Sequence, residues 1–258
     1  MKPRTRHLVL VLGDQLDAGA AAFDDFDARE DAVWMAEVAG EAEHVWSGKP
    51  RIALFLAAMR HFAQALREAG LRLHYRRLDD PANAGTLAAE LAGALRELQP
   101  QRVVMTAPGD WRVWQDIRGV VQAAGIAFEV REDRHFYCTV RDFAAFARGR
   151  TQMRLEHFYR LQRKRHDVLM RDGQPEGGRW NLDAENRASF GREGPGMVPA
   201  PARVAPDAIT REVLALVQTR FAAHPGSLAD FAWPVTRAQA LEALHVFVEQ
   251  RLPMFGPY

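Results

Sequence analysis

The chain has 258 residues, with 34 Lys and Arg against 33 Asp and Glu, and hydrophobic residues make up 48% of it. This composition indicates a globular protein and excludes a chain that is disordered throughout, because disorder combines low hydrophobicity with high net charge. At a formal net charge of +1 the chain has no overall field that attracts nucleic acid or acidic membranes, so any such contact must come from a local patch.

Cys138 is the single cysteine of the sequence. One thiol excludes a disulfide framework, a cysteine-only zinc site and an iron–sulfur cluster within this chain, and it suits the reducing cytoplasm, where we expect the protein. The segment around Cys138 is typical of ordinary packing, and we assign no catalytic residue. None of the 9 histidines forms a close ligand pair, so we predict no metal site. The longest apolar run has only a strand's length, so we expect no membrane partner.

Strands and helices alternate through the first half of the chain. Residues 8–12 are a continuous aliphatic run, typical of a strand buried on both faces, and residues 32–38 form a second strand. Residues 51–69 have the three-four apolar spacing of an amphipathic helix, with Pro50 in the first turn and Gly70 after the end. The remaining expected elements are strands at 71–78, 102–106 and 126–131 and helices at 84–98 and 113–124.

This alternation predicts an α/β fold, with an open parallel five-stranded Rossmann-like sheet and helices on both faces. In such sheets the usual switch point lies beside the first strand, and it places the ligand crevice above that strand's carboxyl end.

The pattern changes after about residue 140. A basic helix is expected over 151–171, a long extended connection over the Gly- and Pro-rich residues 172–206, and two helices around 207–221 and 236–252. Two helices are too few for an independent core. The predicted parts are therefore an α/β domain at 1–140, an interdomain linker with the basic helix at 141–206, and the start of a truncated all-α domain at 207–258.

Polar residues follow the first two strands, at the edge where open parallel sheets bind ligands. Gly13, Asp14 and Gln15 form either a ligand loop or an ordinary strand-ending turn. Glu37 and Glu41 are four residues apart, which places them on one face if the segment is helical. They are either acceptors in the same crevice or a solvated helix start. No GxGxxG or GxxxxGK[ST] motif is present, so a dinucleotide or P-loop site lacks its usual basis.

Two further segments have both a functional and an ordinary interpretation. The segment 160–166 contains four Arg or Lys residues that could contact phosphates, with Tyr159 and Trp180 as stacking groups. The alternative, which the sequence favours, is the solvated face of a connecting helix or a docking surface. His61 lies off the apolar face of its helix and is expected to face solvent or a neighbouring loop.

Four segments together carry a resemblance to a known family. They are residues 10–16 (LVLGDQL), 58–63 (AMRHFA), 108–113 (PGDWRV) and 177–187 (GGRWNLDAENR). The residues of these segments and the order of the segments along the chain resemble those of the deoxyribodipyrimidine photolyase-related proteins, the iron–sulfur bacterial cryptochromes and photolyases. The resemblance runs through the whole chain.

The resemblance implies that this chain is the N-terminal antenna half of such a protein. Family members are about twice this length and continue into a helical domain that binds FAD and holds a [4Fe–4S] cluster. Both cofactors are therefore expected only in the C-terminal half. The family's α/β domain holds the antenna chromophore 6,7-dimethyl-8-ribityllumazine at the carboxyl edge of its sheet.

The resemblance also implies which residues would hold that chromophore. The residues that match the family's pocket are Gly13, Asp14, Gln15, Glu37 and Glu41. A planar heterocycle with a ribityl chain needs hydrogen-bond acceptors beside an apolar wall, which Phe55 and Leu56 could supply.

The implied function is the light-harvesting portion of a flavin-dependent DNA photolyase or blue-light photoreceptor. DNA would be a partner of the intact family protein, and we expect no repair activity from this chain alone. The alternative is a small-ligand binding or interaction module without photochemistry, which a colourless protein that takes up no lumazine would support.

The last two helices are expected to expose an apolar patch and to promote self-association. Their apolar positions are Val213, Leu214, Val217, Phe221, Leu241, Leu244, Phe247 and Val248. Deletion of everything after about residue 206 is expected to give a better-behaved monomer.

Overall fold

The computed structural model describes residues 5–181, 189, 191–194 and 196–254. The chain groups into two compact units. The first combines the stretch that ends at Glu132 with Ala202–Ala243, and the second combines Asp133–Pro201 with the stretch that starts at Leu244. The domain boundaries expected at 140 and 206 stay a prediction.

The first unit is built on a five-stranded parallel sheet, as predicted, with the strand order β3-β2-β1-β4-β5. The strands are β1 (His7–Leu10), β2 (Ala32–Ala36), β3 (Leu73–Arg76), β4 (Arg102–Thr106) and β5 (Ala127–Arg131). The central strand β1 pairs in parallel with β2 on one side and β4 on the other, with Val9 opposite Val33 and Val104. The order reverses beside β1, so the switch point lies where the sequence predicted it.

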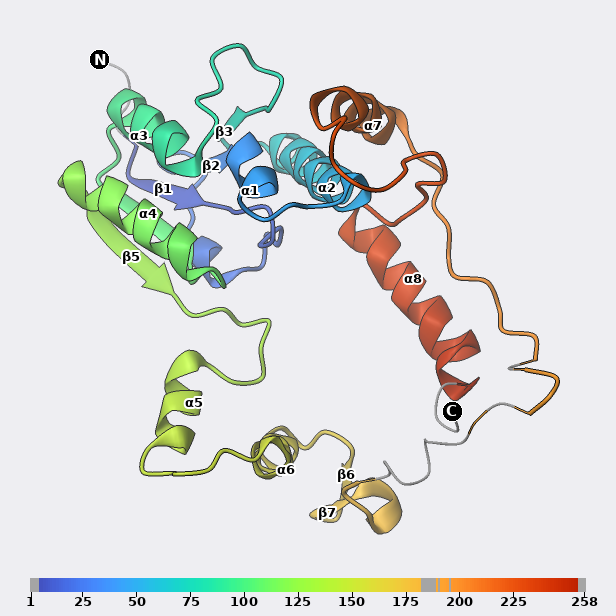
Figure 1. Cartoon of the computed structure of the whole chain (residues 1–258). Coiled ribbons are helices and arrows are strands. Elements are labelled where there is room, and N and C mark those ends of the chain that lie inside the picture. The colour runs from blue at the N-terminus through green and yellow to red at the C-terminus, as the bar shows by residue number, and fades with distance from the viewer. Residues whose placement is uncertain (1–4, 182–188, 190, 195, 255–258) are drawn as a thin grey trace. The chain divides into compact units, whose positions relative to one another are not determined.

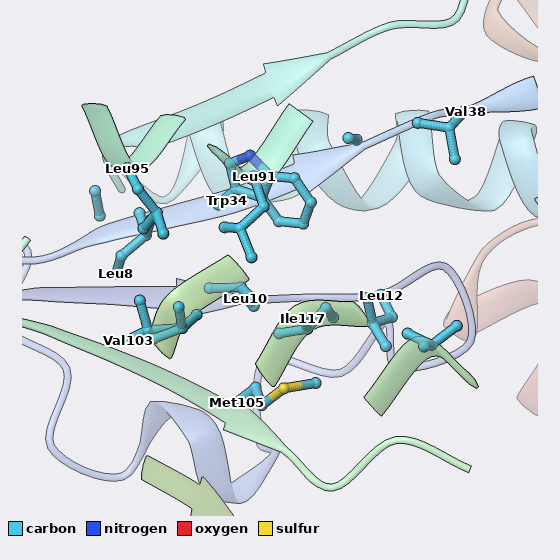
Figure 2. Close-up of a cluster of buried hydrophobic side chains, with 14 residues drawn as sticks. Leu8, Leu10, Leu12, Trp34, Val38, Leu91, Leu95, Val103, Met105 and Ile117 are labelled. Carbon is cyan, nitrogen blue, oxygen red and sulfur yellow. The ribbon is translucent and has the colours of Figure 1, made fainter. Parts of the chain in front are cut away.

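Helices cover both faces of this sheet, because the side chains of a strand alternate between its two faces. The helices α3 (Leu87–Leu98) and α4 (Trp111–Ala123) cover one face, where Figure 2 shows Leu10 packed with Leu91 and Ile117. The long helix α2 (Lys49–Glu68) covers the other face, where Val9 packs with Met59. Figure 1 shows these layers.

Local capping explains where α3 and α4 begin. The Thr86 side chain accepts a hydrogen bond from the backbone N–H of Ala89 at 3.2 Å and so starts α3. The Asp110 side chain accepts from the N–H groups of Arg112 and Val113 at 2.8 and 3.3 Å and so starts α4. The Asp110 cap fixes the N-terminus of α4 directly after β4, at the carboxyl edge of the sheet.

The helix α7 (Ala208–Arg220) packs against α2 (Figure 1). Val213 and Val217 are fully buried and Phe221 is 3% exposed, so the prediction that these three form an exposed patch is wrong. The physical reason is that α2 presents a second apolar face away from the sheet, which α7 covers. Deletion after residue 206 would therefore uncover this face of α2, and we no longer expect it to improve the protein.

The helix α8 (Arg237–Gln250) differs from α7, because Leu241, Leu244 and Val248 on it are exposed. Self-association through these residues stays a prediction.

The second unit contains the short helices α5 (Val140–Ala147) and α6 (Leu155–His166) and a small antiparallel pair, β6 (Met170–Arg171) and β7 (Gln174–Pro175). The helix α5 was not expected, although Thr139 and Asp142 form a capping box at its start.

Single 3-10 turns occur at Ala21–Phe23, Glu176–Gly178 and Leu252–Met254. The motif at 177–187 lies outside the described residues from position 182 on.

Across the described ranges, no helix is both long enough and apolar enough to cross a lipid bilayer.

A buried carboxylate joins the starts of β1 and β2. The side chain of Asp31 is completely buried and accepts hydrogen bonds from the Arg6 guanidinium at 2.6 and 2.9 Å and from the backbone N–H groups of His7 and Asp27 at 3.0 and 2.8 Å. Burial acts to raise the pKa of Asp31, but the hydrogen bonds from Arg6, Asp27 and His7 outweigh it and hold the pKa below its ordinary value.

Because the folded state lowers the pKa of Asp31, this group contributes stability that is present above the ordinary Asp pKa of about 3.9 and is lost as the pH falls through the folded value. We expect Asp31→Asn to destabilise the chain at neutral pH and to flatten the fall in stability on acidification. Urea unfolding at a series of acidic pH values measures both effects, with the exposed Asp230→Asn as control. An unchanged pH profile in Asp31→Asn would contradict this assignment.

Candidate functional site

A cavity of about 560 Å³ lies at the carboxyl edge of the sheet, where β1, β2 and β4 end. This volume falls within the range of about 300–1,000 Å³ that is usual for small-molecule sites. Five of the six residues predicted for the ligand site line the cavity. They are Gly13, Asp14, Glu37, Glu41 and Phe55. Their role in binding stays a prediction.

One wall of the cavity is apolar and comes from α2. Ile52, Phe55, Leu56 and Met59 line it at the spacing of one helix face. Opposite them, the loop after β1 approaches closely at Gly13, where an added Cβ would lie 3.1 Å from the Met59 sulfur. A larger residue at this position would push the loop or the Met59 side chain, so the small residue sets the width of the cavity here.

The mouth of the cavity is bridged by an ion pair between α1 (Ala39–His44) and the start of α4. Arg112 donates two hydrogen bonds to the Glu41 carboxylate, at 3.0 and 2.8 Å. The hydrogen bonds to Glu41, opposed by partial burial, raise the pKa of Arg112. Its Nε is buried and has no hydrogen-bond partner among the described residues. Both residues line the cavity, so this edge presents a paired carboxylate and guanidinium to a ligand, while the Arg112 Nε itself is not accessible from the cavity.

The floor of the cavity holds Glu37, which is already fully hydrogen-bonded within the chain. It accepts from Arg60 at 2.8 and 2.9 Å, from the backbone N–H of Leu78 at 2.8 Å and from the Tyr75 hydroxyl. Because a carboxylate has about four lone-pair sites, all of them are in use. A ligand can accept nothing from Glu37 and can donate to it only by displacing one of these donors, so Glu37 shapes the floor.

The surroundings of Glu37 also affect its neighbours. Burial, together with the negative charge of Glu37, raises the pKa of Tyr75, so the hydroxyl remains a donor. Arg60 is 5% exposed and also lies 3.2 Å from Asp79. A buried charged pair with these additional partners meets the condition under which burial of ions is tolerated.

Gln15 is the predicted site residue that does not line the cavity. Its Nε2 donates to the carbonyl oxygens of Ala107 and Thr106 at 3.0 and 3.3 Å. It therefore joins the loop after β1 to the loop after β4, and in this position it supports the cavity edge from outside.

Glu37 and Glu41 do not share a helix face, because β2 ends at Ala36 and α1 begins only at Ala39, with Glu37 in the turn between them. His61 was expected to face solvent or a neighbouring loop, and it lies against the start of the helix α7, near Asp207 and Thr210. Its Nε2 lies 3.3 Å from Asp207, the residue that caps α7.

Several residues that line the cavity were not predicted from the sequence. For some of them the sequence contains a pattern that could have identified them, and for others it does not. Asp110 and Arg112 belong to the 108–113 motif, so their position after β4 could have identified them. His44 has no such signal. Phe221 lies far along the chain, and neither spacing nor local pattern connects it to the sheet edge.

The other candidate residues are not grouped into a reactive or metal-binding site in the described part of the chain. Cys138 donates a hydrogen bond to the Thr139 carbonyl at 3.1 Å, which is ordinary packing. Among the residues that the structure describes, no three His, Cys, Asp or Glu side chains are grouped closely enough to hold a metal ion. In the second unit the Trp180 ring is flanked by Arg160, Arg163 and Lys164 at 5.2 to 5.5 Å from its centroid, so these cations already contact the proposed stacking surface.

Comparison with known proteins gives two findings. The family described as deoxyribodipyrimidine photo-lyase-related protein matches residues 9–233, a range that contains every residue of the cavity lining. A (6-4) photolyase from Agrobacterium fabrum (strain C58 / ATCC 33970) is 42% identical over 250 residues, which cover 96% of this chain and 49% of the relative. The chain therefore spans about half the length of the curated relative that it matches.

The floor of the cavity can be tested by stability. We expect Glu37→Gln to destabilise the chain by about 3 kcal/mol, toward the lower end of the values for breaking a buried ion pair, because Arg60 keeps Asp79 nearby. Urea unfolding measures the loss. Glu30→Gln, which removes an exposed carboxylate 3.5 Å from Arg6, is the control and should cost less than about 1 kcal/mol. Equal effects of the two substitutions would show that the Glu37 pair is no more important than a surface pair.

Proposed function

The chain belongs to the family of deoxyribodipyrimidine photolyase-related proteins, and from this membership we propose that its α/β unit is the light-harvesting portion of a flavin-dependent DNA photolyase or blue-light photoreceptor. The family generally binds flavin and other chromophores, and it generally acts on DNA. The flavin and the iron–sulfur cluster implied by the resemblance are assigned to protein beyond these residues, and the cavity at the sheet edge is assigned to an antenna chromophore.

The chromophore that we propose for this cavity is 6,7-dimethyl-8-ribityllumazine. The observation that carries the proposal is the combination of an apolar wall and a polar mouth in one cavity of about 560 Å³. A planar ring requires the first and a polyhydroxylated chain requires the second. When bound, this group would supply absorption of short-wavelength visible light.

The chain's own residues have distinct tasks in this proposal. Ile52, Phe55 and Leu56 exclude water from the ring, while Asp14 and Glu41 accept hydrogen bonds at the mouth. The accessible N–H groups of the Arg112 guanidinium, whose side chain is 32% exposed, donate to an acceptor of the ligand. Because Arg112 and Glu41 already hold each other at 2.8 and 3.0 Å, both are oriented before a ligand arrives.

A second candidate function is a small-ligand binding or interaction module without photochemistry. It is favoured by the internal pairing of the two acidic residues after β2 that line the cavity, since Glu37 is saturated and Glu41 is held by Arg112. A chain that binds colourless ligands and takes up no lumazine would support this alternative.

Fluorescence titration with 6,7-dimethyl-8-ribityllumazine tests the proposal. We expect saturable binding to the parent chain and a dissociation constant raised about 5- to 150-fold in Asp14→Ala and in Glu41→Ala, because each removes a hydrogen-bond partner worth about 1–3 kcal/mol. Glu43→Ala is the matched control, because Glu43 is exposed on the same helix as Glu41 and does not line the cavity. Unchanged affinity in both site variants would remove Asp14 and Glu41 from the site, and no binding to the parent chain would reject the antenna assignment.

A further inference from the structure

The cavity has a lining residue that comes from a distant part of the chain. Phe221 directly follows α7, far along the chain from the last strand of the sheet, β5, which ends at Arg131. It is 3% exposed and belongs to the apolar cluster that joins α7 to α2. The wall of the cavity is therefore not made by the α/β sequence alone.

The same face of α2 serves both the cavity and α7. Ile52 and Leu56 line the cavity, and they also belong to the buried cluster that contains Val213, Val217 and Phe221. Figure 1 shows α7 lying beside α2. If α7 left this position, the side chains that form the apolar wall would lose their packing partners on one side, and their positions would no longer be fixed.

Polar contacts join the segment after α7 to residues 45–50, which are the connection between α1 and α2 with the first two residues of α2 and which we call the 45–50 loop. Val45 and Ser47 of this loop line the cavity. The backbone N–H of Lys49 donates to the Pro225 carbonyl at 2.8 Å, and His224 Nδ1 donates to the Ser47 carbonyl at 2.8 Å. The His224 ring also stacks on Trp46, with centroids 4.1 Å apart.

Gly226 shows how closely this segment fits against the loop. Its φ is +92°, and an added Cβ would lie 2.8 Å from the Cδ of Pro50. Only glycine satisfies both the backbone conformation and the close approach. The contact between the segment and the start of α2 is therefore specific in shape as well as apolar.

A chain of charged contacts reaches from α7 to the cavity floor. Glu212 pairs with Arg77 and lies 3.3 Å from Arg60 Nη1, while Arg60 holds Glu37. Next to Arg60 on α2, His61 lies 3.3 Å from Asp207, the residue that caps α7. The segment 207–226 thus contacts the wall, the mouth and the support of the floor.

We propose that residues 207–226, which we call the α7 segment, complete the ligand site: their docking sets the wall and mouth of the cavity and thereby controls how long a ligand is retained. The claim that the α7 segment controls ligand retention rests on the proposed function. The claim that it controls the 45–50 loop does not. A ligand that binds only the docked form stabilises that form by mass action, so occupancy and docking favour each other.

The test uses substitutions that disturb docking without changing a lining residue. Gly226→Ala introduces the clash with Pro50, and His224→Ala removes the hydrogen bond to Ser47; neither residue lines the cavity. Gly70→Ala is the matched control, because Gly70 also has a positive φ, of +77°, but an added Cβ there meets nothing within 4 Å. The control reproduces the backbone strain of Gly226→Ala without the clash.

Two measurements are made on the full chain. Hydrogen exchange without ligand should become faster in residues 45–52 and in 208–220 together in Gly226→Ala and His224→Ala, but not in Gly70→Ala. The dissociation rate of 6,7-dimethyl-8-ribityllumazine should rise about tenfold in the first two variants and stay unchanged in the control. Should Gly226→Ala fail to fold by circular dichroism, His224→Ala provides the same comparison.

The outcomes separate this inference from the proposed function. A parent chain that binds no lumazine rejects the antenna assignment, and the exchange data alone then decide whether the α7 segment controls the 45–50 loop. Faster exchange in 208–220 with unchanged exchange in 45–52 would overturn the inference, because α7 would then be only a cover for α2. Unchanged lumazine dissociation in both variants, with binding to the parent intact, would overturn it as well.

Discussion

The cavity depends on one buried carboxylate. Glu37 receives four hydrogen bonds from Arg60, Tyr75 and Leu78, and these donors come from α2, from β3 and from the turn after β3. Each donor satisfies part of a charge that would otherwise be costly to bury. The arrangement fixes the position of α2 against the end of β2, and α2 in turn supplies the apolar wall of the cavity and the surface on which α7 docks.

The sequence predicted the architecture well, because the features that determine it are local. The aliphatic run at 8–12 can be buried only as a central strand, and the three-four spacing between Ile52 and Leu66 can only cover an apolar surface. In a parallel sheet, residues that follow neighbouring strands reach the same edge, and this alone brought Gly13, Asp14 and Glu37 to one cavity.

What the sequence could not provide is the partner of each side chain. Glu37 and Glu41 look alike in the sequence, yet one is saturated by buried donors and the other is paired at the mouth with Arg112. The difference depends on residues up to 71 positions away. The docking of α7 on α2 was not predicted, for the same reason. The apolar spacing of a helix predicts that one of its faces is buried, but it does not identify the surface that covers this face.

Within the site, residues that support the cavity can be distinguished from residues that would contact a ligand. Glu37 uses both carboxylate oxygens, and Gln15 uses its side-chain N–H, in hydrogen bonds within the chain. Asp14, Glu41 and Arg112 line the cavity, and Glu41 and Arg112 are held there by their own pair. The fold of this chain places the cavity at the carboxyl edge of the sheet, and the ion pair between Arg112 and Glu41 fixes the polar groups at its mouth. The floor is held by the hydrogen bonds to Glu37, and the 45–50 loop is held by its contacts with the α7 segment.

The most direct test is a crystal structure of the chain reconstituted with 6,7-dimethyl-8-ribityllumazine. We expect the ring to lie against Ile52, Phe55 and Leu56, with polar contacts to Asp14, Glu41 or Arg112 and with the four hydrogen bonds of Glu37 intact. A ring bound elsewhere, or one that contacts Glu37 after displacing Arg60 or Tyr75, would contradict the division between a supporting floor and a binding mouth.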